Sequence, residues 1–341
     1  SRSRSPCLAF FPKILSGPIE RSHNLLQQIR SGTAFSYEKA RHGLLLLLWG
    51  YFLKLLIADR LAMIVDAAFA DHAAQTGATM LVAVILYGIE LYADFAGYSS
   101  IAMGIAQTLG YSMTPNFRQP YFAPSIKEFW GRWHVSLSSW LKDYVYIPLG
   151  GNRKGGFRQC LNLLATFLAS GIWHGTGWHF AVWGGIHGIY QVLWKCALPL
   201  RRRAAEKSKI KRDCFSYRLF QAIMTFALVD FAWLFFRAPS ATEAFLILKN
   251  ILGNIQLGET IQYRYYLLGY DERRFYLLLA EIFILFAVDM IHEKKISITA
   301  WLDRQNKAFR WMLYVMAGLA LVIGAIHDYG LDASTFIYTR F

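Results

Sequence analysis

The feature that most constrains this chain is a succession of long apolar runs separated by short loops rich in Lys and Arg. A helix needs about 20 apolar residues to cross the roughly 30 Å hydrocarbon core of a bilayer, and runs approaching this length recur along the sequence. Of all residues, 55% are hydrophobic and only 17% are charged, which is apolar for a soluble protein. The pattern predicts an all-α, polytopic membrane bundle.

The positions of the apolar runs predict where the chain crosses the membrane. One span begins at Gly43 and is interrupted by Lys54, Asp59 and Arg60, charges that have to pair, snorkel or line a cavity. Further spans are predicted at 78–109, 158–174, 178–199, 215–237, 274–292 and 308–327. The apolar piece 7–19 is too short to cross and should lie in the interface or re-enter, and a short amphipathic helix is expected near 241–252.

The net charge of +14 is carried largely by loops between the apolar runs. This distribution is typical of cytoplasmic loops in membrane proteins and argues against nucleic-acid binding. Within the second span, Glu90 and Asp94 lie one turn apart and are followed by small residues. Paired carboxylates can do acid–base chemistry, but we favour tight helix packing around an acid with a polar partner.

The stretch from Ser125 to Tyr144 predicts one amphipathic helix. Pro124 ends any regular structure before it, Ser125 can cap the N-terminus of the helix, and Glu128 completes a capping box. Aromatic and aliphatic residues then recur at helical spacing, and His134 falls on the edge of that stripe. Gly131 and Ser138 leave room beside its imidazole for a substrate.

A second histidine ends the nearly uncharged run from Phe157 to His174. A helix over these residues would rise roughly 27 Å at 1.5 Å per residue. Gly171, Gly175 and Gly177 indicate that the helix ends, bends or packs closely near the histidine. His174 is therefore expected to be buried yet reachable through a pocket.

We interpret His134 and His174 as candidate catalytic residues, because a neutral imidazole is a suitable acceptor for a hydroxyl proton at neutral pH. His179 and His187 lie near His174 in sequence, but no pair has metal-ligand spacing, so packing or hydrogen bonding is the favoured interpretation and no metal is expected. The four cysteines show no metal or redox spacing either.

Several motifs resemble the membrane-bound O-acyltransferase family, in particular its bacterial branch of alginate O-acetyltransferase type. They are F-W-G-R-W-H-V-S-L-S-S-W-L-K-D-Y-V-Y-I-P-L-G-G-N-R and G-I-W-H-G, together with F-F-P-K-I-L-S-G-P-I-E-R (10–21), K-L-L-I-A-D-R-L-A (54–62), Y-A-D-F-A-G-Y-S-S-I-A-M-G (92–104) and the terminal F-I-Y-T-R-F. Family members usually carry more membrane segments before the first of these, and there is no initiator Met. We therefore expect a single, N-terminally incomplete transmembrane domain over 1–341.

The resemblance implies an O-acetyltransferase with no bound cofactor, using acetyl-CoA or another acyl thioester as donor substrate. Acetyl groups would move through a central passage toward an extracytoplasmic polysaccharide, in the bacterial inner membrane and with an extracytoplasmic partner protein. The residues expected to bind substrate are Trp130, Arg132, Trp133, Ser138, Asn152, Arg153 and Trp173.

Two alternatives differ in function. The same fold can transfer D-alanyl groups to teichoic acid, although Y-I-P-L-G-G-N-R resembles the alginate-type branch more closely. A non-catalytic polysaccharide or lipid transporter would also show alternating spans, but transporters usually contain matched repeat halves, and none is visible here.

The basic clusters and the number of spans place two parts of the chain on opposite sides of the membrane. Residues 201–212 contain seven basic residues and one acid and should be cytoplasmic, whereas the C-terminus should be extracytoplasmic. Reporter fusions at Arg203 and at Phe341 should report opposite sides. Fusions that report the same side would contradict this topology.

Overall fold

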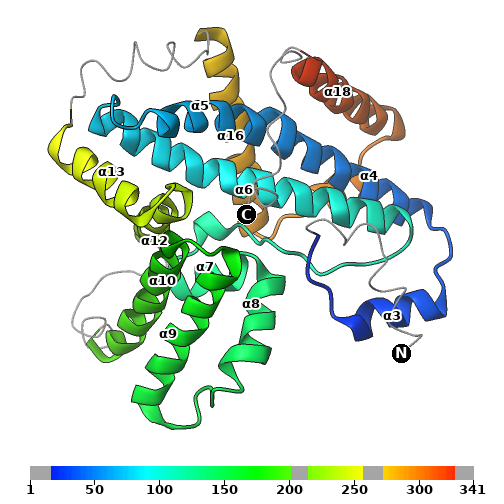
Figure 1. The fold of residues 1–341 in the computed structure, drawn as a ribbon. Coiled ribbons are helices and arrows are strands. Elements are labelled where there is room, and N and C mark those ends of the chain that lie inside the picture. Colours follow the sequence, from blue (N-terminus) through cyan, green and yellow to red (C-terminus); the bar gives the residue numbers. More distant parts are fainter. Residues whose placement is uncertain (1–16, 201–213, 256–271, 327–341) are drawn as a thin grey trace. The chain divides into compact units, whose positions relative to one another are not determined.

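A computed structural model describes residues 17–200, 214–255 and 272–326 (Figure 1). All regular structure in these ranges is helical, which confirms the predicted all-α class. The α-helices are α3 (Ser22–Ser31), α4 (Tyr37–Tyr51), α5 (Asp59–Ala70), α6 (Gly77–Thr108), α7 (Ile126–Arg132), α8 (Val135–Leu141), α9 (Gly155–His174), α10 (Trp178–Cys196), α12 (Phe215–Arg237), α13 (Ala241–Gly253), α16 (Glu272–Glu293), α17 (Ile298–Asp303) and α18 (Lys307–Ile326).

Short segments of different pitch join some of these helices. A π-helical segment, η1 (Phe52–Ala58), connects α4 to α5, and another, η3 (Lys142–Tyr146), extends α8. A single 3₁₀ turn, η2 (Pro120–Phe122), precedes α7. Segments of π-helix are rare and occur frequently near functional sites.

Four described helices are long and apolar enough to cross a membrane: α6, α12, α16 and α18. They coincide with the predicted spans at 78–109, 215–237, 274–292 and 308–327, and α13 matches the short helix expected near 241–252. The spans expected at 158–174 and 178–199 form α9 and α10, for which crossing stays a prediction. The segments 7–16 and 201–212 and the C-terminus lie outside the described residues.

The described chain forms two compact units. Unit one comprises 17–67, 89–116 and 272–326, and unit two comprises 68–88, 117–200 and 214–255. In unit one, α4 and α6 lie side by side (Figure 1). A Cβ on Gly50 would lie 2.7 Å from the Gly97 carbonyl oxygen, and one on Gly43 would lie 2.7 Å from that of Gly104. Only glycine permits this separation, which confirms the tight packing expected of α6.

The charges that interrupt the first predicted span are paired within unit one. Lys54 Nζ lies 2.7 Å from both Asp59 Oδ1 and Asp94 Oδ1. Arg60 Nη1 donates to both carboxylate oxygens of Glu281, at 2.6 and 2.7 Å, and its Nη2 donates to the Gly324 carbonyl. The polar partner expected for Asp94 is therefore Lys54, whereas Glu90 is buried and its role stays a prediction.

Unit two contains an α9–α10 hairpin whose helices lie side by side (Figure 1). A Cβ on Gly171 would collide with the Phe180 carbonyl oxygen, and a Cβ on Gly184 would collide with that of Phe167. Helix α12 packs against α10, and its fully buried residues include Trp233, Phe235 and Phe236.

The single helix expected from Ser125 to Tyr144 is broken. Its start is as predicted, since Ser125 Oγ accepts a hydrogen bond from the Glu128 backbone N–H at 3.2 Å. The helix stops at Arg132, Trp133 is extended, and His134 adopts a left-handed conformation before α8 begins. The aromatic stripe is therefore divided between two short helices.

Removing the charge of Lys54 should destabilise unit one. Lys54→Met leaves Asp59 and Asp94 without their shared cation, and breaking a buried ion pair from one side typically costs roughly 3–5 kcal/mol. We expect the lower end of that range because the Lys54 side chain is 16% exposed. Thermal unfolding in detergent measures the loss, with the exposed Lys249→Met as a matched control. Equal unfolding temperatures for the two variants would contradict the prediction.

Candidate active site

The two histidines predicted to be catalytic belong to unit two and are both buried. His174 is the last residue of α9 and is 6% exposed. The helix ends there at Gly175, where a Cβ would collide with the Phe180 ring. His134 lies between α7 and α8 and is 4% exposed.

His134 has a strained backbone, with φ 43° and ψ 53°. A non-glycine residue in this region costs about 1–3 kcal/mol and persists only where the surroundings enforce it. The hydrogen bond from Trp133 N to Phe129 O, at 2.8 Å, closes α7, and that from Ser138 N to His134 O, at 2.9 Å, opens α8. Both helices therefore fix the position of this histidine.

The two imidazoles interact electrostatically. Burial lowers the pKa of His134 well below 6.5, and the charge of nearby His174 lowers it further. His134 is consequently neutral at physiological pH, with one ring nitrogen able to donate and the other able to accept.

Aromatic rings surround His174. Its ring centroid lies 4.9 Å from Trp173, 5.2 Å from Trp183 and 5.3 Å from Phe236, all in edge-to-face arrangements. Trp173 is 54% exposed, whereas Trp183 is 1% exposed. The imidazole thus lies in an apolar environment with an exposed aromatic ring on one side.

His187 forms the hydrogen bond that was favoured for it over metal binding. Trp130 Nε1 donates to His187 Nδ1 at 3.2 Å, and the two rings meet edge to face at 5.0 Å. The Trp130 ring also contacts Phe167 and Trp183. Trp130, predicted to bind substrate, therefore lies among the aromatic rings next to His174.

Three other residues predicted to bind substrate, Arg132, Trp133 and Ser138, lie within four residues of His134 in the sequence. Trp133 is 1% exposed and packs against Phe117, Phe129 and Trp233. Arg132 pairs with Glu128 and donates to the Gln119 carbonyl, and Ser138 Oγ donates to the Trp133 carbonyl at 3.2 Å. Their described contacts support the α7–α8 break, and binding of substrate by them stays a prediction.

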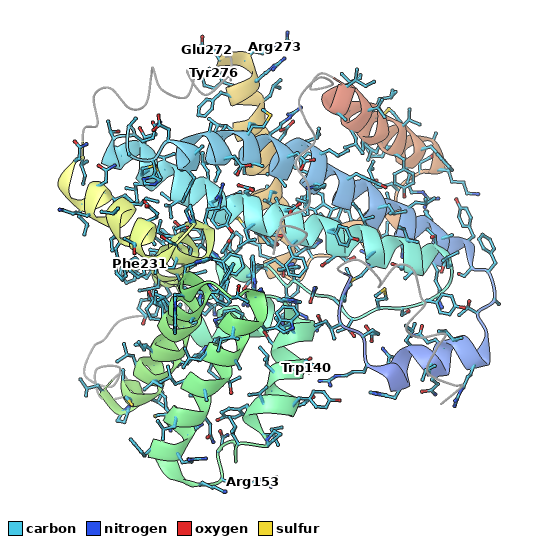
Figure 2. The ribbon with its side chains drawn as sticks, viewed as in Figure 1. Trp140, Arg153, Phe231, Glu272, Arg273 and Tyr276 are labelled. Carbon is cyan, nitrogen blue, oxygen red and sulfur yellow. The ribbon has the colours of Figure 1, made fainter. Side chains whose placement is uncertain are left out.

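Asn152 and Arg153 precede the first residue of α9, whereas His174 is its last residue. Figure 2 labels Arg153 at that end of the helix. Asn152 Oδ1 accepts hydrogen bonds from Tyr146 and Gln159, and Arg153 is exposed. A 20-residue helix rises about 30 Å. If these residues bind a donor, they contact a part of it far from the atoms that react at His174.

A stripe of buried polar residues links the two ends of α9. Asn162, Thr166, Ser170 and His174 recur every fourth residue and are all buried. Asn162 Nδ2 donates to the Gly151 carbonyl at 3.0 Å, and Thr166 Oγ1 donates to the Asn162 carbonyl at 2.7 Å. This polar face leads from the basic turn 150–158 to the histidine.

Sequence reasoning missed Asp230, a 5%-exposed carboxylate in α12. It approaches Gly88 and the hydroxyl of Tyr121, which donates to the Gly88 carbonyl. Burial, followed by the Asp230 charge, raises the pKa of Tyr121 well above 10. The one acid within the apolar run 215–237 was the available signal.

The described chain also contains a cavity of about 930 Å³ in unit one, between α4, α16 and α18. Its lining is mainly apolar and includes Arg60 and Glu281 but neither His134 nor His174. In this cavity Arg60 and Glu281 are already paired with each other. The buried histidines therefore define the candidate site, because a neutral imidazole can accept a proton whereas a paired guanidinium cannot.

A model of the membrane-bound O-acyltransferase family matches residues 8–236, a range that includes both histidines and all seven predicted substrate residues. The chain belongs to the membrane-bound O-acyltransferase family. The resemblance drawn from the motifs is thereby confirmed.

Similar proteins include three that are named for different activities. The chain is 39% identical over 233 residues to the probable alginate O-acetylase AlgI of Pseudomonas putida, covering 68% of this chain and 45% of that protein. It is 34% identical over 248 residues to a peptidoglycan O-acetyltransferase of Helicobacter pylori, covering 72% and 46%. It is 29% identical over 199 residues to a teichoic acid D-alanyltransferase of Streptococcus thermophilus, covering 54% and 48%. The chain thus spans about half the length of these relatives.

The lowered pKa of His134 predicts a specific dependence of stability on pH. An unfolded histidine titrates near pH 6.5, so below that pH the unfolded chain binds a proton that folded His134 does not. The contribution of His134 to the free energy of unfolding is therefore fully present above about pH 6.5, and it is lost as the pH drops below that value. His134→Gln should lose less stability between pH 7.5 and pH 5.5 than the wild type.

Thermal unfolding in detergent at the two pH values measures this difference. His23→Gln, at an exposed position of α3, controls for loss of a histidine. If the wild type and His134→Gln lost the same stability between the two pH values, His134 would bind protons equally in the folded and unfolded states, which would contradict the prediction.

Proposed function

We propose that this family member is a membrane O-acetyltransferase that moves acetyl groups toward an extracytoplasmic polysaccharide. The observation that carries the proposal is the convergence of His134 and His174, two buried and interacting imidazoles, within the region that matches the family. Acyl transfer to a hydroxyl needs a group that removes the hydroxyl proton, and a neutral histidine is suited to that role.

In the proposed reaction His174 is the general base. The hydroxyl oxygen of the acceptor attacks the carbonyl carbon of the acyl thioester while His174 takes the hydroxyl proton. The tetrahedral intermediate then collapses and the C–S bond breaks. His174 returns its proton to the departing sulfur, which leaves as the thiol, and the imidazole is neutral again. The aromatic rings of Trp183 and Phe236 keep the imidazole neutral between turnovers because they exclude water from it.

His134 is proposed to orient the acyl thioester beside His174. Its backbone is fixed from both sides by α7 and α8, so little conformational freedom remains to be lost when the donor binds. Trp130 and Trp173 would form the apolar walls of the acyl site, one within the cluster and one at its exposed side.

The donor is proposed to be acetyl-CoA, a substrate rather than a resident cofactor. Arg153 and the neighbouring basic residues of 150–158 offer an exposed positive surface for its phosphates. The polar stripe of α9 would guide the flexible arm from that surface toward His174. We further propose that the enzyme lies in the bacterial inner membrane and that an extracytoplasmic partner protein places the acetyl group on the polysaccharide.

Acetyl transfer is favoured over the two alternatives. The relatives named for O-acetylation are 39% and 34% identical, whereas the D-alanyltransferase is 29% identical over a smaller share of the chain. A transporter without chemistry is disfavoured because the chain belongs to a family of acyltransferases.

Replacing His174 with Gln should nearly abolish acetylation. Glutamine keeps comparable bulk and hydrogen bonding but cannot accept and return the proton, and general-base catalysis is typically worth about 10²–10⁴ in rate. The measurement is polysaccharide O-acetyl content in cells that carry equal amounts of wild-type or variant protein in their membranes. His134→Ala should lower acetylation strongly in the same assay.

His179→Gln is the matched control, because His179 lies one turn from Trp183 on α10 but is only partly buried and contacts Phe180 rather than His174. It should leave acetylation near the wild-type level. Near-normal acetylation in cells with His174→Gln would exclude His174 as the general base. Near-normal acetylation with His134→Ala would show that His134 only packs.

A further inference from the structure

Two buried N–H groups on one face of α10 lack an acceptor within the described residues. They are Nε1 of Trp183 and Nε2 of His187, one turn further along the helix. Trp183 is 1% exposed and His187 is fully buried. Their rings meet edge to face, with centroids 5.2 Å apart.

The hydrogen bond from Trp130 determines which nitrogen of His187 carries the proton. An indole nitrogen can only donate, so His187 Nδ1 must accept and bears no hydrogen in this contact. In the neutral imidazole the proton is then on Nε2. His187 Nε2 is therefore a donor, and Trp130 holds it in that state.

Trp183 lies next to His174 and also contacts His187. The Trp183 ring centroid is 5.2 Å from that of His174, at the end of α9, and 5.2 Å from that of His187, on α10. A third polar group, Ser170 Oγ, lies one turn before His174 on α9 and also has no partner among the described residues. The candidate base is thus bordered by hydrogen-bonding groups that the protein itself does not use.

A buried donor without an acceptor costs about 1–3 kcal/mol, so most such groups in folded proteins find a partner. Trp183 Nε1–H and His187 Nε2–H only donate in this state, and they match an atom that only accepts. In acyl transfer the carbonyl oxygen is such an atom, and it becomes negatively charged when the hydroxyl attacks.

We propose that Trp183 Nε1–H and His187 Nε2–H bind the carbonyl oxygen of the acyl thioester and stabilise the oxyanion of the tetrahedral intermediate. This inference rests on the proposed acyltransferase function and adds two catalytic residues to it. As the acceptor oxygen bonds to the carbonyl carbon, the C=O electron pair moves to this oxygen while His174 takes the hydroxyl proton. When the C–S bond breaks, the C=O bond re-forms and both donors are released.

The test compares two stable analogues of acetyl-CoA on the full chain in detergent. One has CH₂ in place of sulfur and keeps the carbonyl oxygen, and the other is the S-ethyl thioether, which lacks that oxygen. Trp183→Phe keeps the ring and removes the N–H. It should weaken binding of the ketone roughly tenfold, as expected for one lost hydrogen bond, and leave binding of the thioether unchanged.

Acetylation in cells should fall about 10²-fold in Trp183→Phe, the typical effect of removing one oxyanion donor. At His187, Gln retains an N–H near the Nε2 position and Leu does not, so His187→Gln should keep more ketone binding than His187→Leu. Trp178→Phe is the matched control, because Trp178 is on the same helix but 82% exposed. It should change neither binding nor acetylation.

Two results would overturn the inference. One is a Trp183→Phe variant that still prefers the ketone as strongly as the wild type does, and the other is equal loss of both analogues, which indicates a packing role. Failure of the proposed function is distinguishable, since the wild type would then bind neither analogue and His174→Gln would not change polysaccharide acetylation.

Discussion

The close contact between α9 and α10 is the constraint on which the candidate site depends. Gly171 and Gly184 each lie where a Cβ would collide with a backbone carbonyl of the other helix. Because the helices approach so closely, Trp183 on α10 reaches the His174 ring at the end of α9, and His187 reaches Phe167. A side chain at either glycine would separate the helices, and both ring contacts would be lost together.

The break at His134 complements this hairpin. A continuous helix would have fixed Trp133 and His134 about 100° apart around one axis. With Trp133 extended and His134 left-handed, the tryptophan packs against Trp233 while the histidine interacts with His174. The cost of the strained backbone is small compared with the burial of Trp133, whose side chain is large and almost wholly removed from solvent.

Much of the fold followed from the sequence because its signals are local. Apolar run lengths predicted α6, α12, α16 and α18, and Ser125 and Gly175 marked helix ends. The break at His134 carries no such signal, since neither Gly nor Pro occurs at Trp133–His134 and the aromatic spacing continues through it.

Contacts between distant parts of the sequence could not be predicted in their particulars. The position of Lys54 within an apolar run indicated that it needs an opposite charge, but not that Asp94, forty residues away, would supply it. In the same way, the sequence indicated that His187 would pack or form a hydrogen bond, but not that Trp130 would be the donor. Such pairings depend on how helices rotate against one another, which a single sequence does not encode in any local pattern.

The polar groups inside the two units are arranged differently, and the difference bears on catalysis. In unit one the partly buried Lys54 and the buried Arg60 each pair with a carboxylate, so those charges hold helices together. In unit two Trp183 Nε1 and His187 Nε2 are buried without an acceptor among the described residues. A donor already paired within the protein must break that bond before it can stabilise a developing charge. Donors held in position by packing and left unpaired need no such rearrangement, which is the condition under which electrostatic catalysis is most effective.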